Sequence, residues 1–308
     1  MPRTRSVTVR APAKVNLQLS VGGLREDGFH ELANVYLAVS GYDEITATPA
    51  DRLSLTVSGA GAERVPTDES NLAARAAMLL AKHSGAEPNV RIHITKHLPV
   101  AGGMAGGSAD AAGALVACEA LWNLGVTRAE LASLSAELGS DVPFSVLGGA
   151  ALGLGRGEQL TPLDCGATYH WVFAIAGFGL STPAVYAAQD RHRQEAELPF
   201  TAADMPVPQP SAQLLDALAA GDPQALAASL SNDLESVATA MQPDLAKTLA
   251  AGRASGALAG MLCGTGATTG FLAADAGAAE HIAEQLMASG TCSSTLVAHG
   301  PVPGPVLL

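Results

Sequence analysis

The sequence has few aromatic residues and few basic side chains, and both shortages limit what the protein can be. Aromatic residues make up only 4% of the 308 residues, so a core has to be built mainly from Ala, Val and Leu. There are 17 Lys and Arg against 29 Asp and Glu, which gives a formal net charge of −12. This charge argues against broad nucleic-acid binding, which needs a basic surface to displace counterions from phosphates. Anionic substrates would have to be held by a few local lysines and by oriented backbone N–H groups.

Cysteines and long apolar runs are also scarce. The four cysteines are widely spaced and form no C-x-x-C motif, which is typical of a reduced, intracellular protein and not of a disulfide framework. The longest apolar stretch, residues 171–180, is far shorter than the ~20 residues that a membrane-spanning helix needs. No apolar signal region follows the N-terminal arginines. We therefore expect a cytoplasmic protein that does not cross a membrane, with the oligomeric state open between monomer and homodimer.

The residues that are present indicate a folded protein with two domains. Hydrophobic residues make up 48% and charged residues 15%, and a chain of this length typically forms two domains of roughly 150 residues. Predicted strands and helices alternate irregularly, so we expect two α+β domains, residues 1–158 and 159–308. The pattern predicts helices over 71–83, 108–124 and 223–239, a strand over 90–98 and a glycine-rich, turn-like segment over 148–157.

The most informative segment is PVAGGMAGGSAD, residues 99–110. A predicted strand leads into four glycines, and a predicted helix starts directly after them at Ser108. Glycine lets the backbone adopt positive φ and approach a ligand closely. A helix N-terminus adds unpaired N–H donors and the positive end of the helix dipole. The segment therefore predicts an anion site, most simply for phosphate; a flexible linker is the alternative, but linkers seldom join a strand to a long helix.

The spacing of these glycines matches neither of two common nucleotide loops. Gly102 and Gly107 have the separation of a Walker A loop, but Ser108 occupies the position of the required lysine. The segment also lacks the G-x-G-x-x-G spacing, so a dinucleotide-dependent oxidoreductase loses support.

The loop resembles the phosphate loop of the GHMP kinase superfamily, which includes galactose, homoserine, mevalonate and phosphomevalonate kinases. Three further segments, APAKVNL (11–17), EDGFH (26–30) and LGSDVPF (138–144), resemble those of members that act on a cytidine-diphosphate-linked methylerythritol. The resemblance covers residues 7–300. It implies a two-domain GHMP kinase fold, with an N-terminal ribosomal-protein-like α/β sandwich domain, a C-terminal ferredoxin-like α+β domain and an active site in the cleft between them.

The resemblance also implies a reaction. The 2-hydroxyl of the cytidine-linked substrate would be phosphorylated in the non-mevalonate isoprenoid pathway, with ATP and Mg²⁺ as cofactors. Asp141 would accept or orient the proton of the attacking hydroxyl. Lys14 would lower the pKa of that hydroxyl and offset the charge that develops during transfer. The residues alone leave alternatives open, since Asp141 lies where a helix cap is expected, between Gly139 and Pro143, and Lys14 lies in a strand pattern that allows an exposed charge.

Binding residues follow from the same resemblance. ATP contacts are implied at Pro99, Gly102, Gly103, Met104, Ala105, Gly106, Gly107 and Ser108 of the loop and at Asn71 and Lys96, with Ser108 also a candidate Mg²⁺ ligand. Substrate contacts are implied at Asn16, Phe29, His30, Asp141, Thr182, Tyr186, Gly264, Thr265 and Gly266. The cytosine would stack between Phe29 and Tyr186, and His30 would bind its edge.

Several of these residues have simpler interpretations. Asn71 and Ser108 are also typical helix caps, Lys96 could end a strand in solvent, and His30 could be a loop residue without a role. Phe29 replaces the tyrosine that is usual in the related kinases, which keeps the ring face but loses a hydroxyl. Asp110 would place negative charge close to a bound triphosphate.

Three other functions remain as alternatives. A GHMP kinase for mevalonate or homoserine is disfavoured by the Asp-Gly-Phe-His segment and by Lys14 in its Ala-Lys-Val-Asn context. A non-catalytic paralogue that binds a metabolite is disfavoured because Lys14 and Asp141 are both present. A dinucleotide-dependent oxidoreductase is the most remote.

Overall fold

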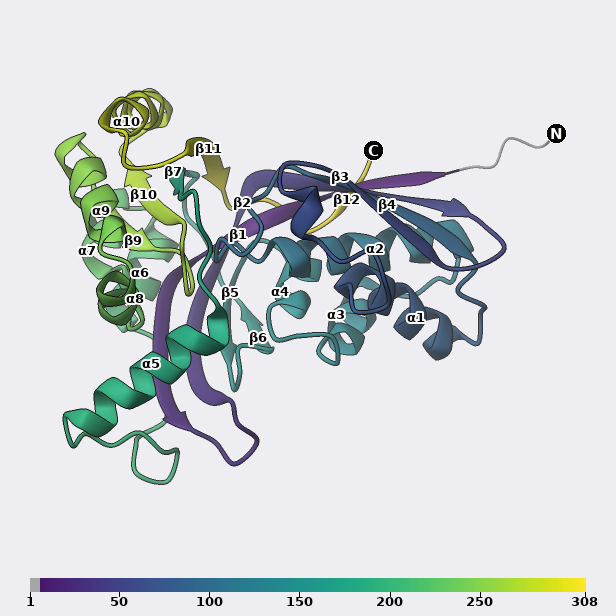
Figure 1. Ribbon diagram of the computed structural model, residues 1–308, viewed down its shortest axis with the longest axis horizontal. Coiled ribbons are helices and arrows are strands. Elements are labelled where there is room, and N and C mark those ends of the chain that lie inside the picture. Colours follow the sequence, from purple (N-terminus) through teal and green to yellow (C-terminus); the bar gives the residue numbers. More distant parts are fainter. Residues whose placement is uncertain (1–5) are drawn as a thin grey trace.

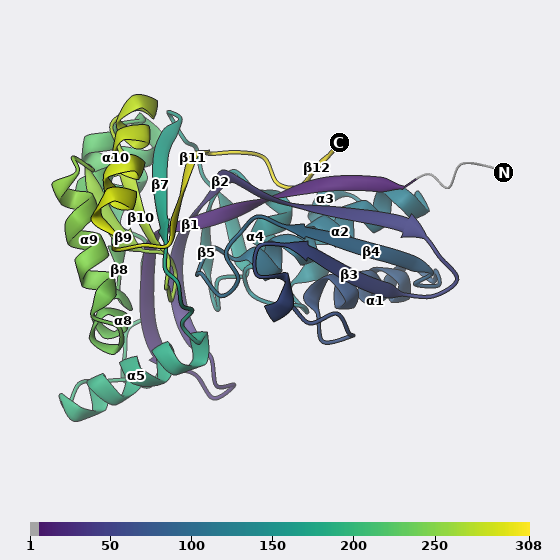
Figure 2. The same ribbon diagram turned by 45° about the horizontal axis from the view of Figure 1, so that its top comes forward.

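The computed structural model describes residues 6–308, and these residues form two β-sheets with helices packed against them (Figures 1 and 2). The first sheet has the strand order β12-β1-β2-β4-β3; in addition β5 pairs with β2, β6 pairs with β5, and β8 pairs with β1. Its strands are β1 (Val7–Leu24), β2 (His30–Pro49), β3 (Ser54–Gly59), β4 (Val90–Lys96), β5 (Ala150–Leu154), β6 (Gln159–Pro162), β8 (Ser231–Asn232) and β12 (Val306–Leu307). The second sheet has the order β11-β7-β10-β9, from β7 (Tyr169–Ile175), β9 (Ala259–Leu262), β10 (Thr269–Ala273) and β11 (Ser294–Gly300). The predicted α+β class is confirmed.

The helices divide between the two sheets. Those of the first half lie below the first sheet in Figure 1, and α9 and α10 lie against the second sheet. The helices are η1 (Ala62–Arg64), α1 (Leu72–Ser84), α2 (Gly106–Trp122), α3 (Arg128–Ser135), α4 (Val142–Leu147), α5 (Thr182–Glu195), α6 (Ala212–Ala220), α7 (Pro223–Ser229), α8 (Glu235–Met241), α9 (Asp244–Ala254) and α10 (Ala276–Ser289). None of the helices within residues 6–308 has the length and apolarity to cross a bilayer.

The two longest strands, β1 and β2, form one antiparallel pair that links the two halves of the molecule (Figure 2). The register of this pair shifts between Pro12 and Ala13 and again between Asn16 and Gln18. Proline has no N–H to donate to a strand ladder, which explains the first irregularity. Such bulges re-aim the neighbouring side chains and are frequent beside active sites. Here they flank Lys14 and Asn16.

The helix after the glycine loop, α2, is buried over most of its length. Residues 109–118 are all buried, and half of them are alanine. A Cβ on Gly113 would lie 2.5 Å from Cδ1 of Ile45, so any larger residue there would force the Ile45 side chain or the helix to shift. Small side chains therefore bring α2 against β1 and β2, and the N-terminus of the helix ends up beside Lys14 of β1.

Three local predictions are wrong. The long helix begins at Gly106 and not at Ser108, because residues from Gly106 onward already have helical geometry. The segment 148–157 contains strand β5, which pairs with β2 and β6. The glycines that flank and interrupt this short strand made the sequence resemble a turn. The expected helix over 223–239 is split into α7 and α8, because the residues between them pair with β1 as β8.

The domain boundary at 158/159 stays a prediction. Strands β6, β8 and β12 come from beyond residue 158 and belong to the first sheet.

A buried group of charges lies beneath the glycine loop. Nζ of Lys96 donates to Oδ2 of Asp110 at 2.8 Å and also to Oδ2 of Asp43, and all three side chains are at most 4% exposed. Oδ1 of Asp43 accepts the backbone N–H groups of His97 and Leu98 at 2.6 and 2.9 Å. The carboxylate of Asp110 is thus paired with Lys96, whose charge offsets the negative charge that was expected close to a bound triphosphate. The cluster fastens the end of β4 to β2 and α2.

The buried cluster predicts a pH-dependent stability. Burial raises the pKa of Asp110 to about 7, although the Lys96 charge opposes the shift, and the Asp43 carboxylate adds to it. Burial also acts to lower the pKa of Lys96, but the two carboxylates outweigh it and the net direction is upward. An aspartate in an unfolded chain ionises near 3.9, so the unfolded chain releases this proton first as the pH rises. The stabilisation is complete below about pH 4 and is lost as the pH rises through 7.

We expect Asp110→Asn to remove the contribution of Asp110 to the pH dependence of stability, since Asn keeps the size of the side chain but does not titrate. The fall in the free energy of unfolding between pH 5 and pH 8 should become smaller than in the unmodified chain by on the order of 2 kcal/mol. Urea denaturation at the two pH values measures it. Asp244→Asn, at an exposed carboxylate paired with Lys247, is the control and should leave the difference between the two pH values unchanged. Equal pH dependence in Asp110→Asn and the unmodified chain would contradict the prediction.

Candidate active site

A cavity of about 640 Å³ is lined by β1 and β2, by the glycine loop and by parts of the chain beyond residue 139. Most of the residues implied by the resemblance line it, although they come from distant parts of the sequence. They are Lys14, Asn16, Phe29, His30, Gly102, Gly103, Ala105, Gly106, Gly107, Ser108, Asp141, Thr182, Tyr186, Gly264 and Thr265. Pro99, Met104, Asn71, Lys96 and Gly266 do not contribute to its lining.

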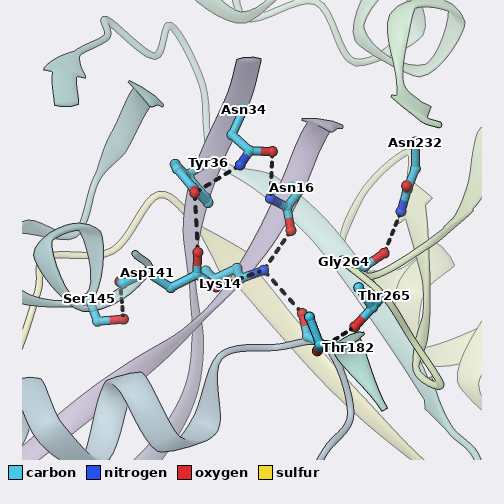
Figure 3. Close-up of polar contacts among 11 residues, drawn as sticks. Lys14, Asn16, Asn34, Tyr36, Asp141, Ser145, Thr182, Asn232, Gly264 and Thr265 are labelled. Carbon is cyan, nitrogen blue, oxygen red and sulfur yellow. Dashed lines mark hydrogen bonds and ion pairs between the residues drawn. The ribbon is translucent and has the colours of Figure 1, made fainter. Parts of the chain in front are cut away.

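Five polar side chains at one end of this cavity form a closed ring of contacts (Figure 3). Nζ of Lys14 donates to Oδ1 of Asn16 at 2.6 Å and lies 3.5 Å from Oδ2 of Asp141. Nδ2 of Asn16 donates to Oδ1 of Asn34 at 3.3 Å. Nδ2 of Asn34 donates to the hydroxyl of Tyr36 at 2.9 Å, and this hydroxyl donates to Oδ1 of Asp141 at 3.2 Å. The ring joins β1, β2 and the turn before α4.

The chemistry of lysine determines the direction of every bond in the ring. An ammonium group can only donate, so the oxygen of Asn16 must face Lys14 and its NH₂ must face Asn34. The same reasoning orients the amide of Asn34 and leaves the proton of Tyr36 for Asp141. Burial is the main cause that raises the pKa of Tyr36 well above its usual value, and the nearby Asp141 charge adds to it. Tyr36 therefore stays a phenol, and Asp141 receives two donors.

The side chain of Asp141 is not a helix cap. Asp141 precedes α4, but its carboxylate makes no capping hydrogen bond. Its carbonyl oxygen instead accepts the Ser145 hydroxyl at 3.0 Å, and its side chain is 33% exposed at the cavity wall. The local alternative of a cap is thus wrong for the side chain, and the carboxylate is available to a ligand.

Lys14 is not an exposed charge at a strand edge. The residue is only 4% exposed, and its Nζ also donates to the carbonyl oxygen of Gly103 at 3.2 Å. Because its backbone N–H donates to the carbonyl of Met104 at 3.3 Å, Lys14 is bonded to the glycine loop through both main chain and side chain. A single residue of β1 therefore connects the loop with Asp141.

The glycine loop has the geometry of an anion site. The first N–H groups of α2, those of Gly106, Gly107 and Ser108, have no hydrogen-bond partner among residues 6–308, as expected for the first turn of a helix. The Ser108 hydroxyl likewise has no partner within the described chain and does not cap the helix. Ala105 precedes the helix at φ 58°, a left-handed conformation that is costly for alanine and that concentrates at functional sites.

The loop also packs against a second glycine segment, residues 264–267. Gly103 has φ +79°, and a Cβ there would lie 1.9 Å from the carbonyl oxygen of Cys263, so no other residue fits. The N–H of Thr268 donates to the carbonyl of Gly102 at 3.2 Å. Nδ2 of Asn232, in β8, donates to the carbonyl of Gly264 at 2.7 Å, so β8 holds the backbone of this glycine segment in place (Figure 3). The two glycine segments thus border the same cavity.

Aromatic and charged side chains line the other end of the cavity. Phe29 is 48% exposed, and the guanidinium of Arg156 lies 4.6 Å from its ring centroid. The ring of Tyr186 stacks on His30 at a centroid distance of 5.0 Å and 29° between planes. Nε2 of His30 lies 2.8 Å from Oδ1 of Asp190. Thr182 and Thr265 also line the cavity, and their hydroxyls contact each other at 3.0 Å (Figure 3).

Four functional candidates were missed from the sequence, namely Asn34, Tyr36, Arg156 and Asp190. Asn34 and Tyr36 are two residues apart on β2, a spacing that puts both on one face of a strand. This spacing was the available signal, but it does not say which face of β2 meets Lys14. The other two carry no local signal, because α5 was not predicted at all and Arg156 lies in a turn.

Two residues implied in nucleotide binding are engaged elsewhere. Asn71 caps α1, since its Oδ1 accepts the N–H of Ala73 at 2.8 Å and its Nδ2 donates to the carbonyl of Pro66 at 2.7 Å. Lys96 belongs to the buried cluster with Asp43 and Asp110. Contact of these two residues with ATP stays a prediction.

The side chains fit Mg²⁺ that arrives with a nucleotide better than a protein-bound ion. No group of three or more His, Cys, Asp or Glu that could hold a metal occurs within the described part of the chain. Mg²⁺ usually binds one or two protein oxygens and takes its remaining ligands from phosphates and water. The Asp141 carboxylate and the Ser108 hydroxyl supply oxygens of this kind on the cavity wall.

A strand–glycine loop–helix anion site beside an ammonium–carboxylate pair is the arrangement of a small-molecule kinase, and comparison with known proteins agrees. The model of the GHMP kinases N terminal domain matches residues 71–149, and that of the GHMP kinases C terminal region matches residues 214–291. A solved homoserine kinase from Cytophaga hutchinsonii superposes with a TM-score of 0.76 at 17% identity, covering 100% of this chain and 99% of that one. At that identity the likeness shows the fold alone, which confirms the predicted two-domain GHMP kinase fold.

More similar proteins narrow the family. A solved 4-(cytidine 5'-diphospho)-2C-methyl-D-erythritol kinase superposes with a TM-score of 0.74 at 33% identity, over 95% of this chain and 98% of that one. The 4-diphosphocytidyl-2-C-methyl-D-erythritol kinase of Streptomyces avermitilis is 58% identical over 98% of this chain and 100% of its own length. That of Mycolicibacterium smegmatis is 54% identical over 98% and 92%. The chain belongs to the 4-diphosphocytidyl-2-C-methyl-D-erythritol kinase family of the GHMP kinases.

Proposed function

We propose that the protein transfers the γ-phosphoryl group of ATP to the 2-hydroxyl of 4-diphosphocytidyl-2-C-methyl-D-erythritol, in the non-mevalonate isoprenoid pathway. The products are the 2-phosphate and ADP. One observation carries the proposal beyond family membership: the Lys14–Asp141 pair borders the same cavity as the unpaired N–H groups at the start of α2. A group that activates an alcohol and a site for phosphate are therefore close enough to serve one reaction.

In this mechanism the ring of polar side chains activates the 2-hydroxyl of the substrate for attack on the γ-phosphorus. Asp141 accepts the hydroxyl proton, or orients it, as the oxygen attacks phosphorus. The new oxygen–phosphorus bond forms as the bond between the γ-phosphorus and the bridging oxygen breaks, and ADP leaves with the electron pair. Lys14 lies beside Asp141 and stabilises the negative charge on the attacking oxygen. Tyr36 holds the carboxylate in place by donating to its other oxygen.

The glycine loop supplies the charge neutralisation that phosphoryl transfer requires. The free N–H groups of α2 and the positive end of its dipole bind the phosphates. Because positioning and electrostatics provide most of the rate, the protein needs no covalent intermediate. Mg²⁺, when bound with ATP, neutralises phosphate charge, and Ser108 is the proposed protein ligand.

The far end of the cavity is proposed to bind the cytidine. Phe29 and Tyr186 provide ring faces for the base, and His30 provides a polar atom for its edge. Thr182, Thr265 and the backbone of Gly264–Gly266 would contact the substrate between the base and the reacting hydroxyl. Asn16, which bonds to Lys14, would contact the methylerythritol itself.

An assay of ADP release tests the function. The purified protein is incubated with ATP, Mg²⁺ and one of 4-diphosphocytidyl-2-C-methyl-D-erythritol, mevalonate, homoserine or galactose. We expect turnover with the first substrate alone. Turnover with mevalonate or homoserine in its place would assign another GHMP kinase activity, and no turnover with any of the four would favour a non-catalytic binding protein.

A further inference from the structure

The contact between His30 and Asp190 has no role in phosphoryl transfer, although both residues line the cavity. Nε2 of His30 lies 2.8 Å from Oδ1 of Asp190, and the side chains are only 6% and 16% exposed. Tyr186 precedes Asp190 by one turn of α5, so the two residues share a face of the helix. One helix face therefore contacts the imidazole twice, once by stacking and once by a hydrogen bond.

The helix that carries Asp190 is firmly attached to the first sheet. Arg193, one turn further on, is buried and donates to the carbonyl oxygens of Gly22 at 2.9 Å and Val21 at 2.6 Å. These carbonyls belong to β1, and His30 begins the next strand, β2. The position of Asp190 relative to His30 is thus set by packed secondary structure and not by a loop.

The chemistry of this contact determines which ring nitrogen carries the proton. A carboxylate only accepts, so Nε2 of His30 must carry the proton that it donates to Asp190. Nδ1 of the neutral ring is then an acceptor, and it has no hydrogen-bond partner among residues 6–308. A ligand in the cavity meets His30 as an acceptor of hydrogen bonds.

We propose that Asp190 is a positioning residue that fixes this tautomer of His30 and thereby selects a cytosine over a uracil. The proposal rests on the proposed function in one respect, namely that His30 faces the edge of the base. Cytosine carries an exocyclic amino group that can donate to Nδ1, whereas uracil carries a carbonyl oxygen at the same position. With uracil two acceptors face each other, and a buried polar group without a partner is costly.

Binding of cytidine diphosphate and uridine diphosphate to the full-length protein, measured by calorimetry, tests the selection. We expect the unmodified protein to bind cytidine diphosphate at least about tenfold more tightly. In Asp190→Leu a side chain of similar size has no acceptor for the Nε2 proton, so the ring loses the bond that holds its proton on Nε2, and the proton can move to Nδ1 and turn the acceptor into a donor. The ratio of the two dissociation constants should then fall by roughly tenfold or more. Glu195→Leu makes the same change of charge at an exposed position of α5 and should leave the ratio unchanged.

Nitrogen-15 NMR of the His30 ring at pH 8 measures the tautomer directly, in the unmodified protein and without substrate. A proton on Nε2 supports the proposal, and a proton on Nδ1 overturns it, as does an unchanged ratio of dissociation constants in folded Asp190→Leu. Neither measurement involves phosphoryl transfer. Failure of the ADP-release assay would therefore refute the proposed activity separately, and failure of these two measurements would refute the role of Asp190.

Discussion

Asp141→Asn should lower kcat by roughly 10²–10⁴-fold, the usual range for loss of a general base, with little change in KM. The amide has the size of the carboxylate, so the cavity keeps its shape. It cannot take a proton from the substrate hydroxyl, and it places either an NH₂ group or a weaker acceptor before Lys14 and Tyr36. Steady-state ADP release at saturating ATP measures the effect.

The same substitution separates catalysis from helix capping. Asn is as good an N-cap as Asp, so a residue that only capped α4 would tolerate the change. The matched control is Asp275→Asn, because Asp275 caps α10 by accepting the N–H of Ala278 at 2.8 Å and does not line the cavity. We expect this control to keep full activity. A fall in kcat of less than about fivefold in Asp141→Asn would remove Asp141 from the mechanism.

Lys14→Met should lower kcat by on the order of 10²–10³-fold, the cost of removing one preorganised donor from a site where negative charge develops. Met approximates the length of the lysine chain without its charge. The substitution also removes the donor to Gly103 and to Asn16, so the loop loses one of its contacts with β1. We therefore expect KM for ATP to rise as well, unlike in Asp141→Asn.

The measurement is again ADP release, with kcat and KM determined separately and folding checked by thermal denaturation. Lys247→Met is the control, because Lys247 is an exposed lysine whose partner, Asp244, lies one turn away on the same helix. The role of Lys14 would be refuted if folded Lys14→Met retained kcat close to that of this control.

Local sequence determined the elements whose signal lies within a few residues. The strand–glycine–helix order of residues 90–122 could be predicted because glycine favours special backbone conformations and alanine favours a helix. The Asn71 cap was one of two expectations for that residue, and the structure confirms it. The family was identified from four segments in a fixed order, which the comparisons bear out.

The assembly of the site required the tertiary structure. From residue spacing alone, the Asp141 side chain could either cap a helix or face a cavity. Likewise, the Lys14 side chain could be either exposed to solvent or buried. The register of β1 against β2, with its bulges beside Lys14, places Asn34 and Tyr36 so that they complete the ring of contacts that includes Asp141. That ring spans contacts more than 100 residues apart in sequence.

The sequence by itself predicted a phosphate site on a glycine loop and identified the family to which the chain belongs. Only the tertiary structure decided that Asp110 turns to a buried lysine and that Asp190 meets His30. The physical reason is that backbone preferences act over a few residues, whereas the partner of a side chain depends on which strands pair and how closely helices pack against them.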